Sequence, residues 1–171
     1  MNLELITKYH PNGQKEYEGY YDETQPVGDQ TAWYENGNKD FESIELSESV
    51  ELCTYWHENG QIKSKGIRTN YFETGLWTYW FENGSKKSEG CFEGEDGCVG
   101  KWRYWHNNGQ LACSGIFQGF RGNGLWTFWD ESGSKVHEYK YRENEFLGVC
   151  KNLRLDGCSD ELVDKYKQYL F

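Results

Sequence analysis

The four histidines could do chemistry, because an imidazole can act as a general base or as a metal ligand. His10, His57 and His106 each stand three residues before a recurring glycine, and His137 stands outside this pattern. If each recurring unit contributes two strands, alternate units lie roughly 19 Å apart, at about 4.8 Å per strand. One metal ion cannot span that distance, so the spacing favours half-exposed strand residues.

The six cysteines lack the paired spacing of a zinc site or of a disulfide framework. Cys53 and Cys150 stand where a recurring aromatic block otherwise carries tryptophan, which indicates small packing residues. The glycines of residues 119–124 join two predicted strands and precede no helix, unlike a phosphate-binding loop. We therefore expect reduced thiols, no metal, no cofactor and no enzymatic activity.

Seven glycines recur at intervals of 23 to 25 residues, and an aromatic block precedes most of them. Aromatic and β-branched residues favour strands, and Asn-Gly between two such runs is a strong hairpin signal. A fixed period of this length indicates one supersecondary unit copied along the chain. The turn glycines are Gly13, Gly37, Gly60, Gly84, Gly109, Gly133 and Gly157.

Each unit is predicted to be two antiparallel strands. The predicted fold is all-β, with stacked hairpins of about 24 residues over residues 4–158 that form an elongated, twisted meander sheet. The turn is either a two-residue type I′ loop at Asn-Gly or a three-residue loop closed by a glycine bulge. The alternatives differ by one residue in register, which reverses the faces of the second strand.

The two faces of the first strand can be compared between copies. The residue four positions before the turn glycine is large in every copy, as at Trp80 and Trp105, which predicts a stacked core column. The residues five and seven positions before it are aromatic mainly in the central copies. These rings either form a second core layer or an exposed patch that binds a partner. The candidate binding rings are Tyr55, Trp77, Tyr79, Trp102, Tyr104, Trp126 and Phe128.

Acidic residues outnumber basic ones by 28 to 18, which gives a net charge of −10. Such a surface repels nucleic acid and anionic bilayers, so we expect binding to neither. The charge either keeps the chain soluble or attracts a basic protein partner. The candidate acidic contacts are Glu48 and Glu51 in a copy that has lost its glycines, and Glu93, Glu95 and Asp96 before the fifth aromatic block.

The two ends of the chain differ from the repeats. Residues 1–10 lack the basic start and apolar run of a signal peptide, and no stretch has the ~20 apolar residues of a membrane span. We therefore expect a cytoplasmic protein with one domain over residues 1–171. Residues 159–171 are predicted to form a short capping helix, because Ser159 suits an N-cap and apolar residues share one helical face.

The pattern G-x-W-x-Y-W-x-x-N-G, repeated every 23–25 residues, resembles MORN-type repeats. It is most similar to the bacterial variant found in YwqK-family antitoxins, over residues 9–157. The resemblance implies a single-layered β-meander and a non-catalytic role, namely neutralisation of a toxin by direct binding. The acidic charge adds the expectation of a basic toxin domain. It also implies an alternative, which is a scaffold for protein or membrane association. A shared fold does not decide between such roles.

Overall fold

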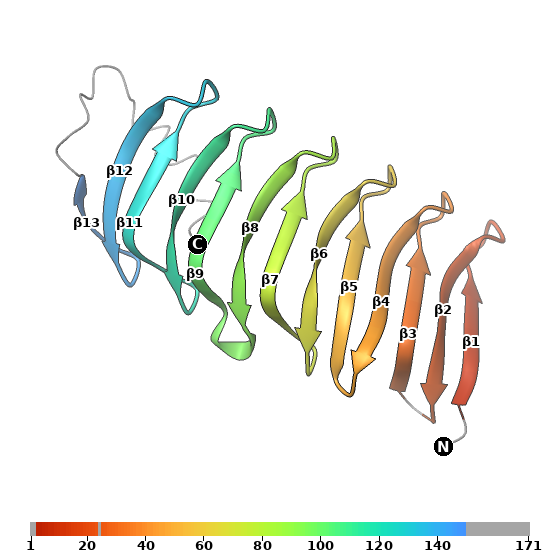
Figure 1. Ribbon diagram of the computed structural model, residues 1–171. Helices are drawn as coiled ribbons and strands as arrows, with labels where there is room; N and C mark the ends of the chain where they lie inside the picture. The colour runs from red at the N-terminus through yellow and green to blue at the C-terminus, as the bar shows by residue number, and fades with distance from the viewer. Residues whose placement is uncertain (1–2, 24, 150–171) are drawn as a thin grey trace. The chain divides into compact units, whose positions relative to one another are not determined.

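The computed structural model describes residues 3–23 and 25–149. The chain divides into two compact units, residues 1–85 and 86–171. Within each unit, neighbouring strands pair antiparallel and follow the order of the chain (Figure 1). The predicted all-β meander of hairpins is therefore confirmed for the described residues of each unit.

The first unit contains β1 (Leu3–Tyr9), β2 (Lys15–Asp22), β3 (Gln25–Trp33), β4 (Lys39–Ser47), β5 (Val50–Trp56), β6 (Ile62–Thr69) and β7 (Phe72–Trp80). The described part of the second unit contains β8 (Lys86–Glu93), the 3₁₀ turn η1 (Gly94–Asp96), β9 (Cys98–Trp105), β10 (Leu111–Gln118), β11 (Arg121–Trp129), β12 (Lys135–Arg142) and β13 (Glu145–Val149).

The turn glycines among the described residues close three-residue loops. In the turn that contains Gly37, Tyr34 N donates to Asn38 O at 2.9 Å, and Gly37 N donates to Tyr34 O at 2.9 Å. Gly37 has a φ of 86°, which is the left-handed conformation that glycine adopts without strain. This is the three-residue hairpin with a glycine bulge, so the structure decides between the two predicted turns.

A tryptophan packed over a glycine builds the core of the inner face, the face that carries the residues five and seven positions before the turn glycine. Trp77 is 1% exposed, and a Cβ added to Gly66 would overlap its indole ring. Residues 75–77 of β7 stand opposite Gly66 alone, and Gly75 has a φ of 65°. The bulge therefore bends the strand so that the ring covers its neighbour. Trp102 over Gly90 and Trp126 over Gly115 repeat this arrangement.

The predicted core column lies on the other face of the sheet and is only half-buried. Trp80 and Trp105 are both partly exposed, so the assignment of the core to this column was wrong. Lysine side chains cover other rings of this column as well as Trp105: Lys86 Nζ lies 5.1 Å from the Trp105 centroid, and Lys39 Nζ lies 5.4 Å from the Trp56 centroid. An aliphatic lysine stem can cover an aromatic ring while its charge stays in water, so this face needs no second layer.

Several predictions fall on residues that the structure does not describe. The capping helix of residues 159–171, the last hairpin strands and the cysteines Cys150 and Cys158 all lie outside the described residues. The predicted single domain over residues 1–171 also stays a prediction.

Candidate binding groove in the first unit

The rings proposed as an exposed binding patch are mostly core residues. Trp77, Trp102, Trp126 and Phe128 are at most 3% exposed, so these four cannot present a surface to a partner. Tyr55, Tyr79 and Tyr104 are half-buried. Of these, Tyr104 stacks on Trp102 with centroids 6.0 Å apart. The other predicted alternative, a core made by these rings, therefore describes the inner face of the central copies.

Glu51 belongs to a half-buried ion pair instead of an open acidic segment. Its carboxylate pairs with the guanidinium of Arg68 at 2.9 Å. Cys53 stands in the tryptophan slot and Ser43 in the slot of the glycine beneath it, and both are fully buried. Burial raises the pKa of the Cys53 thiol to about 11, although Arg68 opposes the shift. The copy without glycines is therefore regular strand, β4 and β5, with a polar interior.

The remaining predicted acidic contacts lie on turns in different units. Glu48 is exposed in the turn between β4 and β5 of the first unit. Glu93, Glu95 and Asp96 are exposed at and after the end of β8 in the second unit, where η1 forms a 3₁₀ turn without a side-chain cap. No described contact gathers these carboxylates into one site within either unit.

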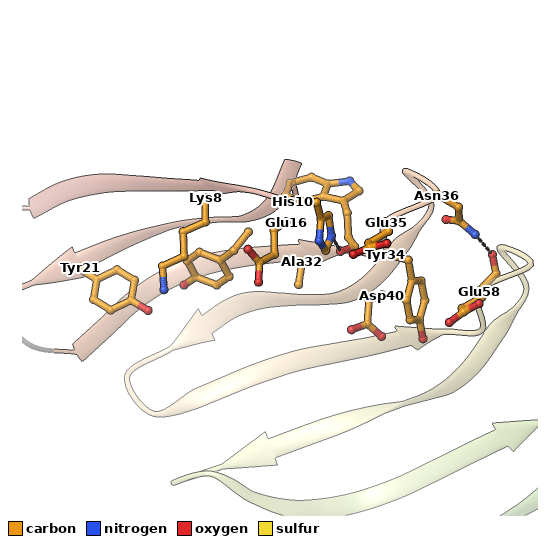
Figure 2. Close-up of a pocket in the computed structure, with 12 residues that line it drawn as sticks. Lys8, His10, Glu16, Tyr21, Ala32, Tyr34, Glu35, Asn36, Asp40 and Glu58 are labelled. Atoms are coloured by element: carbon orange, nitrogen blue, oxygen red, sulfur yellow. Dashed lines mark hydrogen bonds between the residues drawn. The ribbon is translucent and has the colours of Figure 1, made fainter. Parts of the chain in front are cut away.

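A groove opens on the inner face where the first hairpins lack large rings. Lys8 and Ala32 stand five positions before their turn glycines, where Tyr79 and Tyr104 stand in later copies. Gln30 similarly replaces the tryptophan seven positions before the glycine. The resulting groove has a volume of about 630 Å³ (Figure 2). It is lined by Lys8, His10, Glu16, Tyr17, Tyr21, Ala32, Trp33, Tyr34, Glu35, Asn36, Asp40 and Glu58.

A hydrogen-bond ladder between consecutive hairpins holds the rim of the groove. His10 Nε2 lies 2.7 Å from Trp33 O, and Tyr34 donates its hydroxyl to Trp56 O at 2.7 Å. Asn36 Nδ2 donates to Glu58 O at 2.8 Å, as Figure 2 shows. Because a carbonyl oxygen only accepts, His10 must carry a proton on Nε2. These contacts to backbone carbonyls therefore preorganise the rim.

The same ladder explains the histidine spacing and corrects the prediction of half-exposed strand residues, because His10, His57 and His106 each follow the last residue of a strand and His106 is buried. His57 Nε2 lies 3.0 Å from Trp80 O, and His106 Nε2 lies 2.9 Å from Trp129 O. The sequence does carry a signal for this hydrogen-bonding role, because a histidine or a tyrosine, both hydrogen-bond donors, recurs three residues before the turn glycine in several copies. These histidines stabilise the stacking of hairpins.

The groove carries uncompensated negative charge. Glu16, Glu35, Asp40 and Glu58 line it, and within the described part of the chain none of them makes a salt bridge. Lys8 is its one basic residue, and Lys8 Nζ lies 5.8 Å from the centroid of Tyr17. One lysine against four carboxylates leaves an excess of three acidic side chains. The groove therefore attracts cations.

Two tyrosines that line the groove, Tyr17 and Tyr34, have raised pKa values. Burial raises the pKa of Tyr34 to about 12, and the Asp40 carboxylate adds to this shift. Burial also raises the pKa of Tyr17, with a further contribution from Tyr21. Both phenols therefore stay protonated near neutral pH. An aromatic face beside carboxylates suits a cation that is partly desolvated.

In residues 3–23 and 25–149, no group of three or more histidine, cysteine, aspartate or glutamate side chains is arranged to hold a metal ion. The described residues also include no helix with the length and apolar character needed to span a membrane.

Comparison with known families connects this architecture to a class of repeat. Four segments match the family model described as "MORN repeat variant": residues 5–23, 52–70, 73–93 and 99–118. The first segment contains the start of the groove, and the others cover copies that carry Cys53, Trp77 and Trp102. MORN repeats are in general modules that bind proteins or membranes.

Curated proteins and solved structures were also compared with this chain. No curated protein matches the sequence significantly. Among solved structures, "Crystal Structure of TarM" matches with a TM-score of 0.37 and 9% sequence identity. The match covers 68% of this chain and 21% of that chain, so this chain spans about a fifth of that protein.

Proposed function

We propose that this protein is a non-catalytic, cytoplasmic binding protein of the antitoxin or immunity type, which neutralises a toxin by binding a basic domain directly. The observation that carries the proposal is the groove of the first unit, whose four carboxylates make no salt bridge within the described residues. The MORN repeat match supports a role in binding. Four carboxylates around a preformed cavity attract a partner that brings positive charge.

The surroundings of the reactive side chains support a non-catalytic role. Burial raises the pKa of the Cys53 and Cys113 thiols, so neither is a thiolate near neutral pH. The ladder histidines His10, His57 and His106 each hold a backbone carbonyl with Nε2. This contact gives the three rings a structural role in holding consecutive hairpins together.

The first experiment tests neutralisation. A candidate toxin encoded beside this gene is expressed in a bacterial host with and without this chain, and growth is measured. We expect growth to be restored only when the two proteins also co-purify from that host. If the chain binds no neighbouring toxin and protects no culture, the antitoxin role is wrong.

A second measurement tests the electrostatic part of the proposal. Association of the purified toxin should slow as ionic strength rises from about 0.05 to 0.5 M, while dissociation changes much less. An association rate that does not respond to salt would mean that the charge of −10 serves solubility alone. Vesicles with anionic lipid serve as the control, and we expect no binding to them.

A further inference from the structure

We propose that the groove of the first unit binds an arginine side chain of the basic partner. This inference rests on the proposed function, and it adds the chemical group that the partner must present. The observations behind it are the cavity, its four carboxylates, which make no salt bridge within the described residues, and its tyrosine walls. Its volume of about 630 Å³ lies within the ~300–1,000 Å³ typical of ligand pockets.

The charges of the groove identify the occupant as a cation. Glu16 and Asp40 come from the strands β2 and β4, and Glu35 and Glu58 come from the turns after β3 and β5 (Figure 2). The groove therefore presents carboxylates from several elements. A partner with several hydrogen-bond donors can reach more than one of these carboxylates, whereas a neutral or anionic group would leave them without a counter-charge.

The walls of the groove favour arginine over lysine. Tyr17, Tyr21 and Tyr34 line it, and the rings of Tyr17 and Tyr21 meet at 72° with centroids 6.1 Å apart. Lys8 already places its ammonium over Tyr17, which shows that this ring accepts a cation. A guanidinium is planar, less strongly hydrated than an ammonium, and offers five N–H donors, so it can stack on a phenol ring and bond to carboxylates together.

Local sequence differences keep this groove open. Ala32 and Lys8 leave unfilled the positions that tyrosines occupy in the copies of Tyr79 and Tyr104. Gly28 has a φ of 74° and keeps the bulge. Gln30, however, stands where later copies carry a tryptophan, so no indole ring lies over the neighbouring strand here. Instead, Gln30 Oε1 accepts a hydrogen bond from the Tyr17 hydroxyl at 3.2 Å. The bulge is therefore present without the ring that fills the inner face elsewhere.

The chain supplies matched variants for the test. Glu35, Glu58, Glu82 and Glu131 are exposed turn residues, and each accepts an asparagine amide from the preceding hairpin on its backbone carbonyl. Only the first two line the groove. The pair Glu35→Gln and Glu58→Gln therefore removes groove charge, and the pair Glu82→Gln and Glu131→Gln removes the same net charge elsewhere.

The probes are three synthetic peptides of identical sequence with one central arginine, lysine or citrulline, titrated into the full chain by isothermal calorimetry. Citrulline keeps the shape of arginine but lacks its charge. We expect the arginine peptide to bind at least about tenfold more tightly than the citrulline peptide, and more tightly than the lysine peptide. The groove pair should lose about tenfold in affinity for arginine, while the control pair changes less than about twofold.

A variant that fills the groove gives a second test. Ala32→Tyr places the ring found in later copies at this position, and it should abolish arginine binding without lowering the melting temperature. Equal binding of arginine and citrulline peptides, equal losses in both glutamate pairs, or unchanged binding by Ala32→Tyr would each overturn the inference. Tighter binding of lysine would also overturn it. A homodimer that Ala32→Tyr dissolves would assign the groove to a second copy, again against the proposal.

The failures of the two proposals are distinguishable. If a purified toxin is neutralised and keeps its affinity for the groove pair and for Ala32→Tyr, the arginine site is wrong and the antitoxin role stands. If the arginine peptide binds as expected but no toxin is neutralised, the antitoxin role is wrong and the arginine site stands for another basic partner.

Discussion

The first hairpins and the hairpins of the second unit use the same turn and the same hydrogen-bond ladder but differ on the inner face. In the second unit, Trp102 and Trp126 are at most 3% exposed and pack against Phe117, with ring centroids 6.0 and 5.0 Å apart. In the first hairpins, Gln30 and Ala32 occupy the corresponding region beside a groove of about 630 Å³. Two side-chain positions thus decide whether one repeat face becomes core or an open surface.

The copy around β5 shows a third solution. Cys53 leaves room that Arg68 and Glu51 fill as an ion pair, and Arg68 lies 5.5 Å from the centroid of Phe41. Arg68 stands eight residues after its turn glycine, where Phe92 and Phe117 stand in later copies. The comparison teaches that the backbone of this hairpin tolerates an aromatic core, a polar core or a groove, because the turn and ladder hold it independently.

The largest effect should come from removing a core ring in the second unit. Trp102→Ala should lower the free energy of unfolding by about 3–5 kcal/mol, because the buried indole fills the space over Gly90. Trp105→Ala is the matched control on the other face, and it should cost clearly less because that ring is half-exposed. Urea denaturation measures both. Equal losses would contradict the assignment of the core to the inner face.

The next effect concerns the glycines beneath the rings. Gly90→Ala should cost about 1–3 kcal/mol through overpacking, because the new methyl group would overlap the indole of Trp102. Gly19→Ala should cost less, since the nearest atom there is the Tyr17 hydroxyl at the end of a side chain that can move. Thermal melts of both variants test the difference between the inner face of the second unit, which is filled by rings, and that of the first hairpins, which carries the groove. A larger loss at Gly19 would remove that difference.

The ladder should contribute equally in both units. Asn59→Ala and Asn108→Ala should each cost about 1 kcal/mol, because each amide donates to a carbonyl of the next hairpin, at 2.7 and 2.8 Å. Chemical denaturation gives the two values. A difference above about 1 kcal/mol would show that the ladder is not the element that the two regions share.

The smallest effect is a pH dependence that comes from a buried histidine of the second unit. His137 is 5% exposed, neither ring nitrogen has a described hydrogen-bond partner, and burial lowers its pKa. The unfolded chain therefore binds a proton more readily than the folded chain, so stability should fall as pH drops below the ordinary histidine value of about 6.5. His137→Phe should reduce this fall between pH 7.5 and 5.5. An unchanged pH profile of the melting temperature would contradict the buried neutral imidazole.

The groove could not be predicted from the sequence, although the positions that form it were visible. In the sequence, the first two copies simply lack the aromatic residues of the central copies at Lys8, Gln30 and Ala32. What makes them a candidate site is the cavity that they leave beside Tyr17 and the carboxylates that face it without a counter-ion. The acidic residues of Glu93–Gly97 are contiguous, so the sequence alone indicates them as a candidate contact. The groove carboxylates are separated in the sequence, between residues 16 and 58, and only the fold brings them together.

Local signals alone determined the hairpins, their antiparallel order and the position of their turns, because Asn-Gly geometry and aromatic strand propensity act over a few residues. They did not determine which face is the core. Both faces of the strand carry large rings, and an alternating pattern cannot say which ring has a glycine beneath it on the neighbouring strand. Only the tertiary structure placed Trp77 over Gly66 and left Trp80 half-exposed, because the bulge at Gly75 bends the strand toward one face.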